Sequence, residues 1–183
     1  DTRWTGLIEQ QLYGKGCRII EEGLCGRTTV FEDELREGRK GAAFLPTLLE
    51  SHAPVDRVVL MLGTNDCKTI FGASAEIIGK GIVRLLEQIN QYADKMKVLV
   101  ISPIYLGEKV WQDGYDQEFS PESVEVSKKL EPVYEKVAGK YGKRFMRAAD
   151  YASPSEADQE HMDGQSHKIL ADAIYRKLEA EIL

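Results

Sequence analysis

The sequence contains no long apolar run, little cysteine and no excess of basic residues. No stretch approaches the roughly 18 consecutive apolar residues of a membrane-spanning helix, so we expect no membrane contact. Lys and Arg total 24 against 30 Asp and Glu, and the net charge of −6 argues against a nucleic-acid-binding protein. The three cysteines do not form the pattern of a disulfide framework, and no signal peptide is recognisable, so a reducing cytoplasm is the expected compartment.

Motifs that bind phosphates and metals are also missing. Neither a Gly-Lys-Ser/Thr phosphate loop nor a Gly-x-Gly-x-x-Gly stretch occurs, which opposes a nucleotide-binding domain. No cysteine or histidine pair stands at ligand spacing near a third ligand, so we expect neither a metal nor an organic cofactor. Cys25 is interpreted as a small buried thiol and not as a nucleophile.

The 183 residues, of which 43% are hydrophobic and 30% charged, suit one α/β domain. Apolar periodicity predicts helices over residues 5–12, 42–50, 74–93, 121–141 and 165–183, and strands over 17–20, 58–62, 98–101 and 144–146. The expected N-caps are Thr5, Ser74 and Ser120, and Pro46 is expected in the first turn of its helix or at a kink. Residues 58–62 are apolar on both faces, as in a central parallel strand. Alternating strands and helices predict a parallel sheet within a three-layer α/β/α sandwich.

Ligands of such sheets bind beyond the carboxyl ends of the strands. The segments that follow the predicted strands are 21–29, 63–70, 102–116 and 147–167. The second of them contains Gly63-Thr64-Asn65-Asp66, in which Asn65 offers an amide donor and Asp66 is a candidate cap of the turn. A plain strand-to-loop turn is the alternative interpretation.

The last of these segments contains Asp158-Gln159-Glu160-His161. An Asp three residues before a His, in a loop, can orient the imidazole for proton transfer. The alternative is a solvated or capping histidine. His167 stands at the start of the last predicted helix, where a structural role is sufficient.

Gly26, Gly63-Thr64-Asn65-Asp66 and Asp158-x-x-His161 occur in this order, each after a predicted strand. Together with Arg3-Trp4-Thr5-Gly6 and Glu21-Glu22-Gly23-Leu24, they resemble the SGNH hydrolases, also called GDSL-type esterases and lipases. The likeness is closest to the arylesterase/acyltransferase-like branch and covers essentially the whole chain. It implies the flavodoxin-like α/β/α fold of that family.

The resemblance also implies roles for single residues. His161 would act as general base and then acid, and Asp158 would hold its imidazole. The Asn65 side chain and the Gly26 backbone N–H would bind the oxyanion. The nucleophilic serine of the family lies in a Gly-Asp-Ser stretch just after the first strand, and no serine of this chain has that context. We therefore expect residues 1–183 to form a single SGNH hydrolase domain without its first strand and nucleophile loop, with the serine upstream of Asp1.

The implied activity is hydrolysis, or transfer to alcohols, of short-chain acyl esters such as acetyl esters of sugars or aryl alcohols. Its partner would be a small-molecule ester, and self-association into a homo-oligomer stays open. The alternative is an inactive SGNH-fold module that binds carbohydrate or ester ligands. The aromatic residues of the 102–120 loop are candidates for a pocket wall or for ordinary packing: Tyr105, Trp111, Tyr115 and Phe119. Gln159 departs from the family pattern, in which a glycine often follows the Asp.

Overall fold

The computed structural model describes residues 2–92 and 96–182. The helices and strands are α1 (Trp4–Leu12), α2 (Gly41–Ser51), β1 (Arg57–Leu60), α3 (Ala75–Tyr92), β2 (Lys97–Ser102), α4 (Pro121–Lys140), β3 (Arg144–Arg147) and α5 (Gly164–Ile182). Three short 3-10 turns, η1 (Asn65–Cys67), η2 (Thr69–Phe71) and η3 (Ala148–Asp150), follow β1 and β3. No helix in this part of the chain has the length and the apolar composition needed to cross a bilayer.

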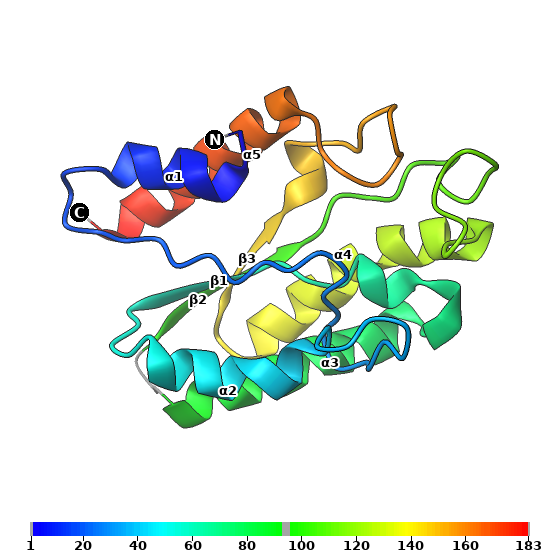
Figure 1. Cartoon of the computed structure of the whole chain (residues 1–183). Helices are drawn as coiled ribbons and strands as arrows, with labels where there is room; N and C mark the ends of the chain where they lie inside the picture. The colour runs from blue at the N-terminus through cyan, green and yellow to red at the C-terminus, as the bar shows by residue number, and fades with distance from the viewer. Residues whose placement is uncertain (1, 93–95, 183) are drawn as a thin grey trace.

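The elements form three layers around a parallel sheet (Figure 1). Within the described residues the sheet has the order β1-β2-β3, and both strand pairs are parallel. Helices α2, α3 and α4 lie on one side of the sheet, and α1 and α5 lie on the other (Figure 1). The predicted α/β/α sandwich is therefore confirmed.

Strand β2 shows how the sequence builds both layers. Val98 and Val100 belong to the hydrophobic cluster of α3 and α4, whereas Leu99 and Ile101 belong to the cluster of α1 and α5. Successive side chains of a strand point to opposite faces, so an unbroken apolar run buries both faces at once. Burying each of these side chains fully stabilises the fold by about 1.5–3 kcal/mol.

The structure corrects two strand predictions. Residues 17–20 are not a strand, although Ile19 packs on the same hydrophobic cluster as Val59. Strand β1 lies at the edge of the sheet, and its residues 57–59 are only half-buried, so it is not a central strand. In the part of the chain that the structure describes, no strand is hydrogen-bonded to the outer side of β1.

The helix ends follow local capping chemistry at two of the three predicted caps. The Ser120 side chain accepts from the Ser123 N–H, and the Ser123 hydroxyl accepts from the Ser120 N–H, which forms a capping box. The Ser74 hydroxyl accepts from the Ile77 N–H at 3.4 Å. The prediction of Thr5 was wrong, since α1 starts one residue earlier and its N-cap is Arg3, with no side-chain hydrogen bond.

Pro46 lies inside α2 and not in its first turn, because the helix already begins at Gly41. A proline has no N–H to donate to the carbonyl four residues earlier, which here is Ala42. The Gln88 side chain of α3 donates to that carbonyl at 2.8 Å instead. Gln88 is buried, so this bond replaces the missing helical bond inside the packed interface of α2 and α3.

Candidate active site

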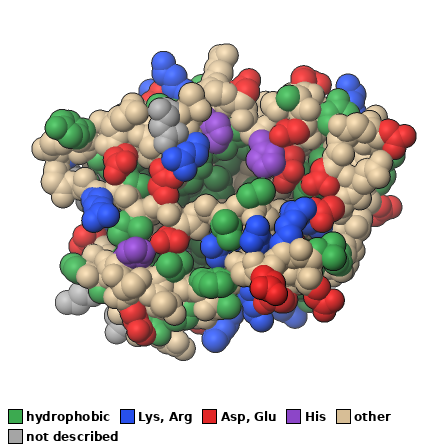
Figure 2. Space-filling model, viewed as in Figure 1, with side chains coloured by type: hydrophobic (Ala, Val, Ile, Leu, Met, Phe, Trp, Pro, Cys, Tyr) green, Lys and Arg blue, Asp and Glu red, His purple; other side chains and the backbone are tan. Residues whose placement is uncertain are grey.

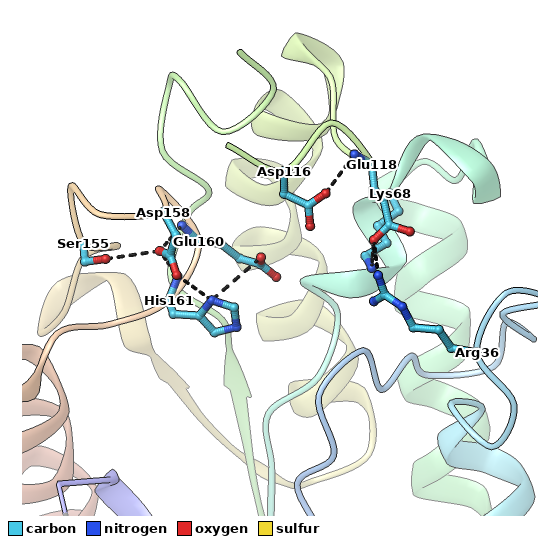
Figure 3. Close-up of polar contacts among 8 residues, drawn as sticks. All are labelled: Arg36, Lys68, Asp116, Glu118, Ser155, Asp158, Glu160 and His161. Atoms are coloured by element: carbon cyan, nitrogen blue, oxygen red, sulfur yellow. Dashed lines mark hydrogen bonds and ion pairs between the residues drawn. The ribbon is translucent and has the colours of Figure 1, made fainter. Parts of the chain in front are cut away.

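The loop after η3 brings Asp158 and His161 into contact (Figure 3). His161 Nδ1 lies 2.8 Å from Asp158 Oδ2. A proton on Nδ1 that donates to this carboxylate leaves the Nε2 lone pair on the outer side of the ring, which is 63% exposed. A histidine held in this way can accept a proton from a nucleophile or from water.

The other carboxylate oxygen of Asp158 is held by its own loop. Oδ1 accepts from the backbone N–H groups of Glu160 at 3.0 Å and His161 at 2.9 Å. Ser155 Oγ also donates to it, at 3.1 Å (Figure 3). Partial burial opposes ionisation, but these backbone bonds and the bond to the His161 ring outweigh it and lower the pKa of Asp158. The carboxylate is thus ionised and oriented before any substrate binds.

Ser155 was not among the residues predicted for the site. Its N–H donates to the His161 carbonyl at 2.7 Å, so the serine closes the loop through its backbone as well as through its hydroxyl. The only signal in the sequence is the spacing Ser155-x-x-Asp158, which is common in turns of many kinds.

Glu160 places a second carboxylate beside the histidine. One of its oxygens lies 3.8 Å from His161 Nδ1, and its side chain is only 12% exposed. Burial raises the pKa of Glu160. The negative charges of Asp116 and Asp158 add to that rise in pKa, and the positive charges of His161 and Lys68 oppose it. The histidine side of the site is therefore acidic.

The structure also brings Asn65 and the Gly26 loop together. Asn65 opens η1, which residues 61–64 connect to the end of β1, and its Nδ2 donates to the Arg27 carbonyl at 3.3 Å. Gly26 is buried with φ at +82°, a conformation that favours glycine. Within the described residues its N–H makes no backbone hydrogen bond. The Asn65 amide is thus hydrogen-bonded to the residue that follows Gly26.

Asp66, the residue after Asn65, also connects these two loops through hydrogen bonds. Its carboxylate accepts from the Thr29 N–H at 3.0 and 3.1 Å and from the Thr29 hydroxyl. Asp66 is fully buried, and burial raises its pKa to about 6. Its side chain therefore anchors a loop 37 residues away, a contact that the prediction of a turn cap did not include.

An ion-pair cluster, Lys68–Glu118–Arg36, lies across from the histidine, with Lys68 buried and the other two side chains partly exposed (Figure 3). Lys68 Nζ lies 2.6 Å from Glu118 Oε2, and the Lys68 side chain is 2% exposed. Arg36 Nη2 lies 2.8 Å from the same oxygen. The hydrogen bond from Lys68 is the main cause that lowers the pKa of Glu118. Asp116 Oδ1 accepts from the Glu118 N–H at 2.9 Å. The cluster joins the loops around residues 36, 68 and 118 into one wall.

Figure 2 shows this face of the molecule hollowed near its centre, with histidine, basic and acidic side chains at the edge of the hollow. No serine hydroxyl in the described residues is hydrogen-bonded to the His161 ring. Ser102 is 1% exposed, and alternation along β2 places it on the face of Val98 and Val100, toward α3 and α4.

One further prediction is wrong, and one open alternative can be compared with the structure. Cys25 is exposed and not a buried thiol. Of the four aromatic residues proposed as a pocket wall, Phe119 is buried in the core cluster of α3 and α4, and Tyr105 donates to Glu131 of α4. Trp111 is partly exposed, and its indole N–H donates to the Glu108 carbonyl at 3.0 Å. These side chains serve local packing more than a shared wall.

The model of the GDSL-like lipase/acylhydrolase family matches residues 1–168. A search of curated proteins gives no match to the chain.

Solved structures similar to the chain include enzymes named as esterases. Est24, a carbohydrate acetylesterase from Sinorhizobium meliloti, is 34% identical with a TM-score of 0.88, over 98% of this chain and 86% of Est24. A carbohydrate acetylesterase family member from the same organism is 30% identical with a TM-score of 0.91, over 99% and 87% of the two chains. The native aryl esterase of M. smegmatis is 31% identical with a TM-score of 0.88, over 98% and 86%.

Proposed function

Because the chain belongs to the GDSL-like lipase/acylhydrolase family and has the SGNH hydrolase fold, we propose that it hydrolyses carboxylic esters with short acyl groups. Family and similar structures support ester hydrolysis in general. The observation that carries the proposal for this chain is the contact of 2.8 Å between Asp158 and His161. It supplies an oriented base with an exposed ring at the end of the sheet where ligands of such folds bind.

The proposed reaction has two half-reactions. In the first, Nε2 of His161 takes the proton of a serine hydroxyl while the serine oxygen bonds to the ester carbonyl carbon. The bond from that carbon to the alcohol oxygen then breaks, and His161 gives the proton to the leaving alcohol. In the second, water loses a proton to His161 and attacks the acyl carbon, and the serine leaves with the proton as the carboxylic acid is released. An alcohol in place of water gives acyl transfer.

Asn65 and Gly26 are the proposed oxyanion donors. An asparagine amide has two N–H bonds, and only one is engaged by the Arg27 carbonyl. The Gly26 N–H lies in the same loop as that carbonyl. A donor aimed at the developing oxyanion contributes about 3–4 kcal/mol to transition-state stabilisation.

The proposed nucleophile is a serine that precedes Asp1 in the natural protein. Two observations support this. Residues 57–59 of β1 are half-buried, and among residues 2–92 and 96–182 the outer edge of β1 pairs with no strand. No described serine is bonded to the His161 ring. A strand paired with β1 and parallel to it would end at the same edge as Asn65, and the loop after it would carry the serine toward His161.

The proposed substrates are acetyl esters of sugars or of aryl alcohols. The support is the activity for which similar proteins are named, two of them as carbohydrate acetylesterases and one as an aryl esterase. The oxygen-rich wall of Asp116 and Glu160 is compatible with a hydroxylated alcohol, since carboxylates accept hydrogen bonds from hydroxyl groups.

The test uses the protein extended upstream of Asp1 to its natural start, with p-nitrophenyl acetate as substrate. His161→Ala should lower kcat about a thousandfold or more, because the serine then has no base. His167→Ala should change kcat little, since its ring accepts from the Trp4 N–H at 3.3 Å and serves α1. Equal losses of kcat in both variants, or a loss in His167→Ala alone, would show that His161 is not the base. Binding of acetylated sugars without any turnover would favour the inactive binding module.

A further inference from the structure

Gln159, between Asp158 and His161, has an unusual backbone conformation. It is the one non-glycine residue among those described with a positive φ, at 61°. Residues with a side chain rarely adopt this left-handed backbone region, whereas a glycine would adopt it without strain. Nevertheless, Gln159 is 5% exposed, so the strained residue is also a buried polar one. Buried polar side chains are kept where their hydrogen bonds are made.

Every polar group of Gln159 has a partner. Its N–H donates to the Ser155 carbonyl at 2.9 Å, and its own carbonyl accepts from the Gly107 N–H at 2.8 Å. Its Oε1 accepts from the Lys109 N–H at 3.4 Å, and its Nε2 donates to Glu156 at 3.1 Å. Two of these bonds stay within the histidine loop, and two reach the loop after β2. Gln159 therefore docks one loop on the other.

Gly107 provides the space for this docking. A Cβ added to Gly107 would lie 2.4 Å from Oε1 and 2.9 Å from Cβ of Gln159. The φ of Gly107 lies outside the left-handed region, so the requirement at this position is space and not backbone freedom. The Gln159 side chain thus lies directly over a residue without a side chain.

The same backbone turn arranges the candidate base. The N–H groups of the two residues after Gln159, Glu160 and His161, both reach Asp158 Oδ1. The His161 carbonyl accepts from the Ser155 N–H. Residues 158–161 keep this arrangement only while Gln159 keeps its left-handed backbone conformation.

We propose that Gln159 is a positioning residue that, through its docking on Gly107 and Lys109, holds Asp158 and His161 in the geometry for proton transfer. The inference rests on the proposed function, because it assigns His161 the role of base. It adds that this chain uses a buried glutamine and a facing glycine as a matched pair. A purely structural role for Gln159 would lower stability without changing the chemistry of the folded protein.

The test compares three variants of the protein extended to its natural start. Gln159→Gly keeps the backbone turn and removes the docking side chain. Gly107→Ala keeps Gln159 and displaces its side chain. Each should lower kcat about tenfold to a hundredfold with KM within about twofold, because a small misplacement of a base acts on the chemical step. In the double variant, Gly107→Ala should cost less than about twofold beyond Gln159→Gly, since the atoms that it meets are gone.

The matched control is Gly139→Ala, where an added Cβ meets no atom within 4 Å and φ is not left-handed. It should leave kcat unchanged. Unchanged kcat in both single variants, or additive losses in the double variant, would overturn the proposal. So would a kcat loss that disappears when activity is normalised to the folded fraction.

A second readout does not depend on activity. The Nδ1–H proton of His161, observed by NMR and assigned with His161→Ala, should broaden or disappear in Gln159→Gly and persist in Gly139→Ala. If esterase activity survives His161→Ala, the proposed function fails while this signal still tests Gln159. If the signal is the same in Gln159→Gly as in the parent protein, the positioning role fails whatever the activity is.

Discussion

Asp158 accepts hydrogen bonds on both carboxylate oxygens before a substrate is present. The backbone and Ser155 hold Oδ1, and the His161 ring is left to Oδ2. Such preorganisation leaves little to rearrange when His161 becomes positively charged in the proposed reaction. The exposed ring and the fixed carboxylate together distinguish this histidine from His52, whose ring pairs with the exposed Glu22 at 2.9 Å.

Asn65 is the residue whose proposed role gives the clearest kinetic signature. Asn65→Ala should reduce kcat by about a hundredfold to a thousandfold with a smaller change in KM, because an oxyanion donor acts mainly in the transition state. Steady-state kinetics on p-nitrophenyl acetate measure both constants. Asn90→Ala, on α3, is the matched control and should match the parent protein. A strong rise in KM at constant kcat would make Asn65 a substrate-binding group instead.

Asp66 predicts a pH dependence of stability. Its pKa is about 6 in the folded protein against an ordinary 3.8, because burial outweighs the hydrogen bonds from Thr29. An acid with a raised folded pKa stabilises the fold fully below about pH 4, and this contribution is lost as the pH rises through 6. The difference corresponds to a loss on the order of 3 kcal/mol.

The comparison with Asp66→Asn isolates this contribution, since asparagine does not titrate. The free energy of unfolding of the parent protein, minus that of the variant, should fall between pH 4.5 and pH 7.5. Urea unfolding at four pH values in that range measures it. A difference that stays constant with pH would show that Asp66 titrates normally.

The spacing of nearby residues predicted part of the candidate site, but contacts between distant parts of the sequence could not be predicted from spacing. Asp158 and His161 lie three residues apart, and the sequence was enough to pair them. The contact between Asn65 and Arg27 spans 38 residues and exists only in the folded sheet. Gln159 was noted only as a departure from the family, because its left-handed backbone depends on contacts with Gly107 that no spacing reveals.

At the level of elements, a helix cap leaves a local signal in the sequence, whereas a strand depends on its partners. The Ser120 capping box is complete within four residues, so its signal is local. A strand exists only through its partners, and residues 17–20 have the composition of a strand without one. For the same reason the apolar run at 58–62 indicated burial on both faces but not the position of β1 in the sheet.

The hydrogen bond from Gln88 of α3 to the Ala42 carbonyl of α2 gives a prediction for stability. Gln88→Leu should destabilise the protein, because the partly buried Ala42 carbonyl loses its side-chain donor. Pro46→Ala restores a backbone N–H to that carbonyl, so the cost of Gln88→Leu should be smaller in this background. A double-mutant cycle from urea unfolding should give a coupling energy of about 1 kcal/mol. A coupling of zero would mean that the glutamine does not compensate for the proline.

At the level of the whole molecule, helices pack on both faces of the sheet, but its strands are not equally buried. Strand β2 is buried on both faces, and β1 is half-buried at the edge. The two proposed oxyanion donors come from loops before and after β1 in the sequence, since Gly26 precedes the strand and Asn65 follows it. A strand added beside β1 would therefore complete the sheet and the proposed active site together.

The last prediction follows from that geometry. A fluorophosphonate should label the protein, extended to its natural start, at one serine that precedes Asp1, because acylation requires a hydroxyl within about 2.6–3.2 Å of the base. Two serines of this chain could be considered as the nucleophile, but neither is suitable. Ser102 is buried in the sheet, and the Ser155 hydroxyl donates to Asp158. Peptide mass mapping locates the labelled residue, and His161→Ala should abolish the labelling. A labelled serine within residues 1–183 that depends on His161 would overturn this assignment and require a rearranged site.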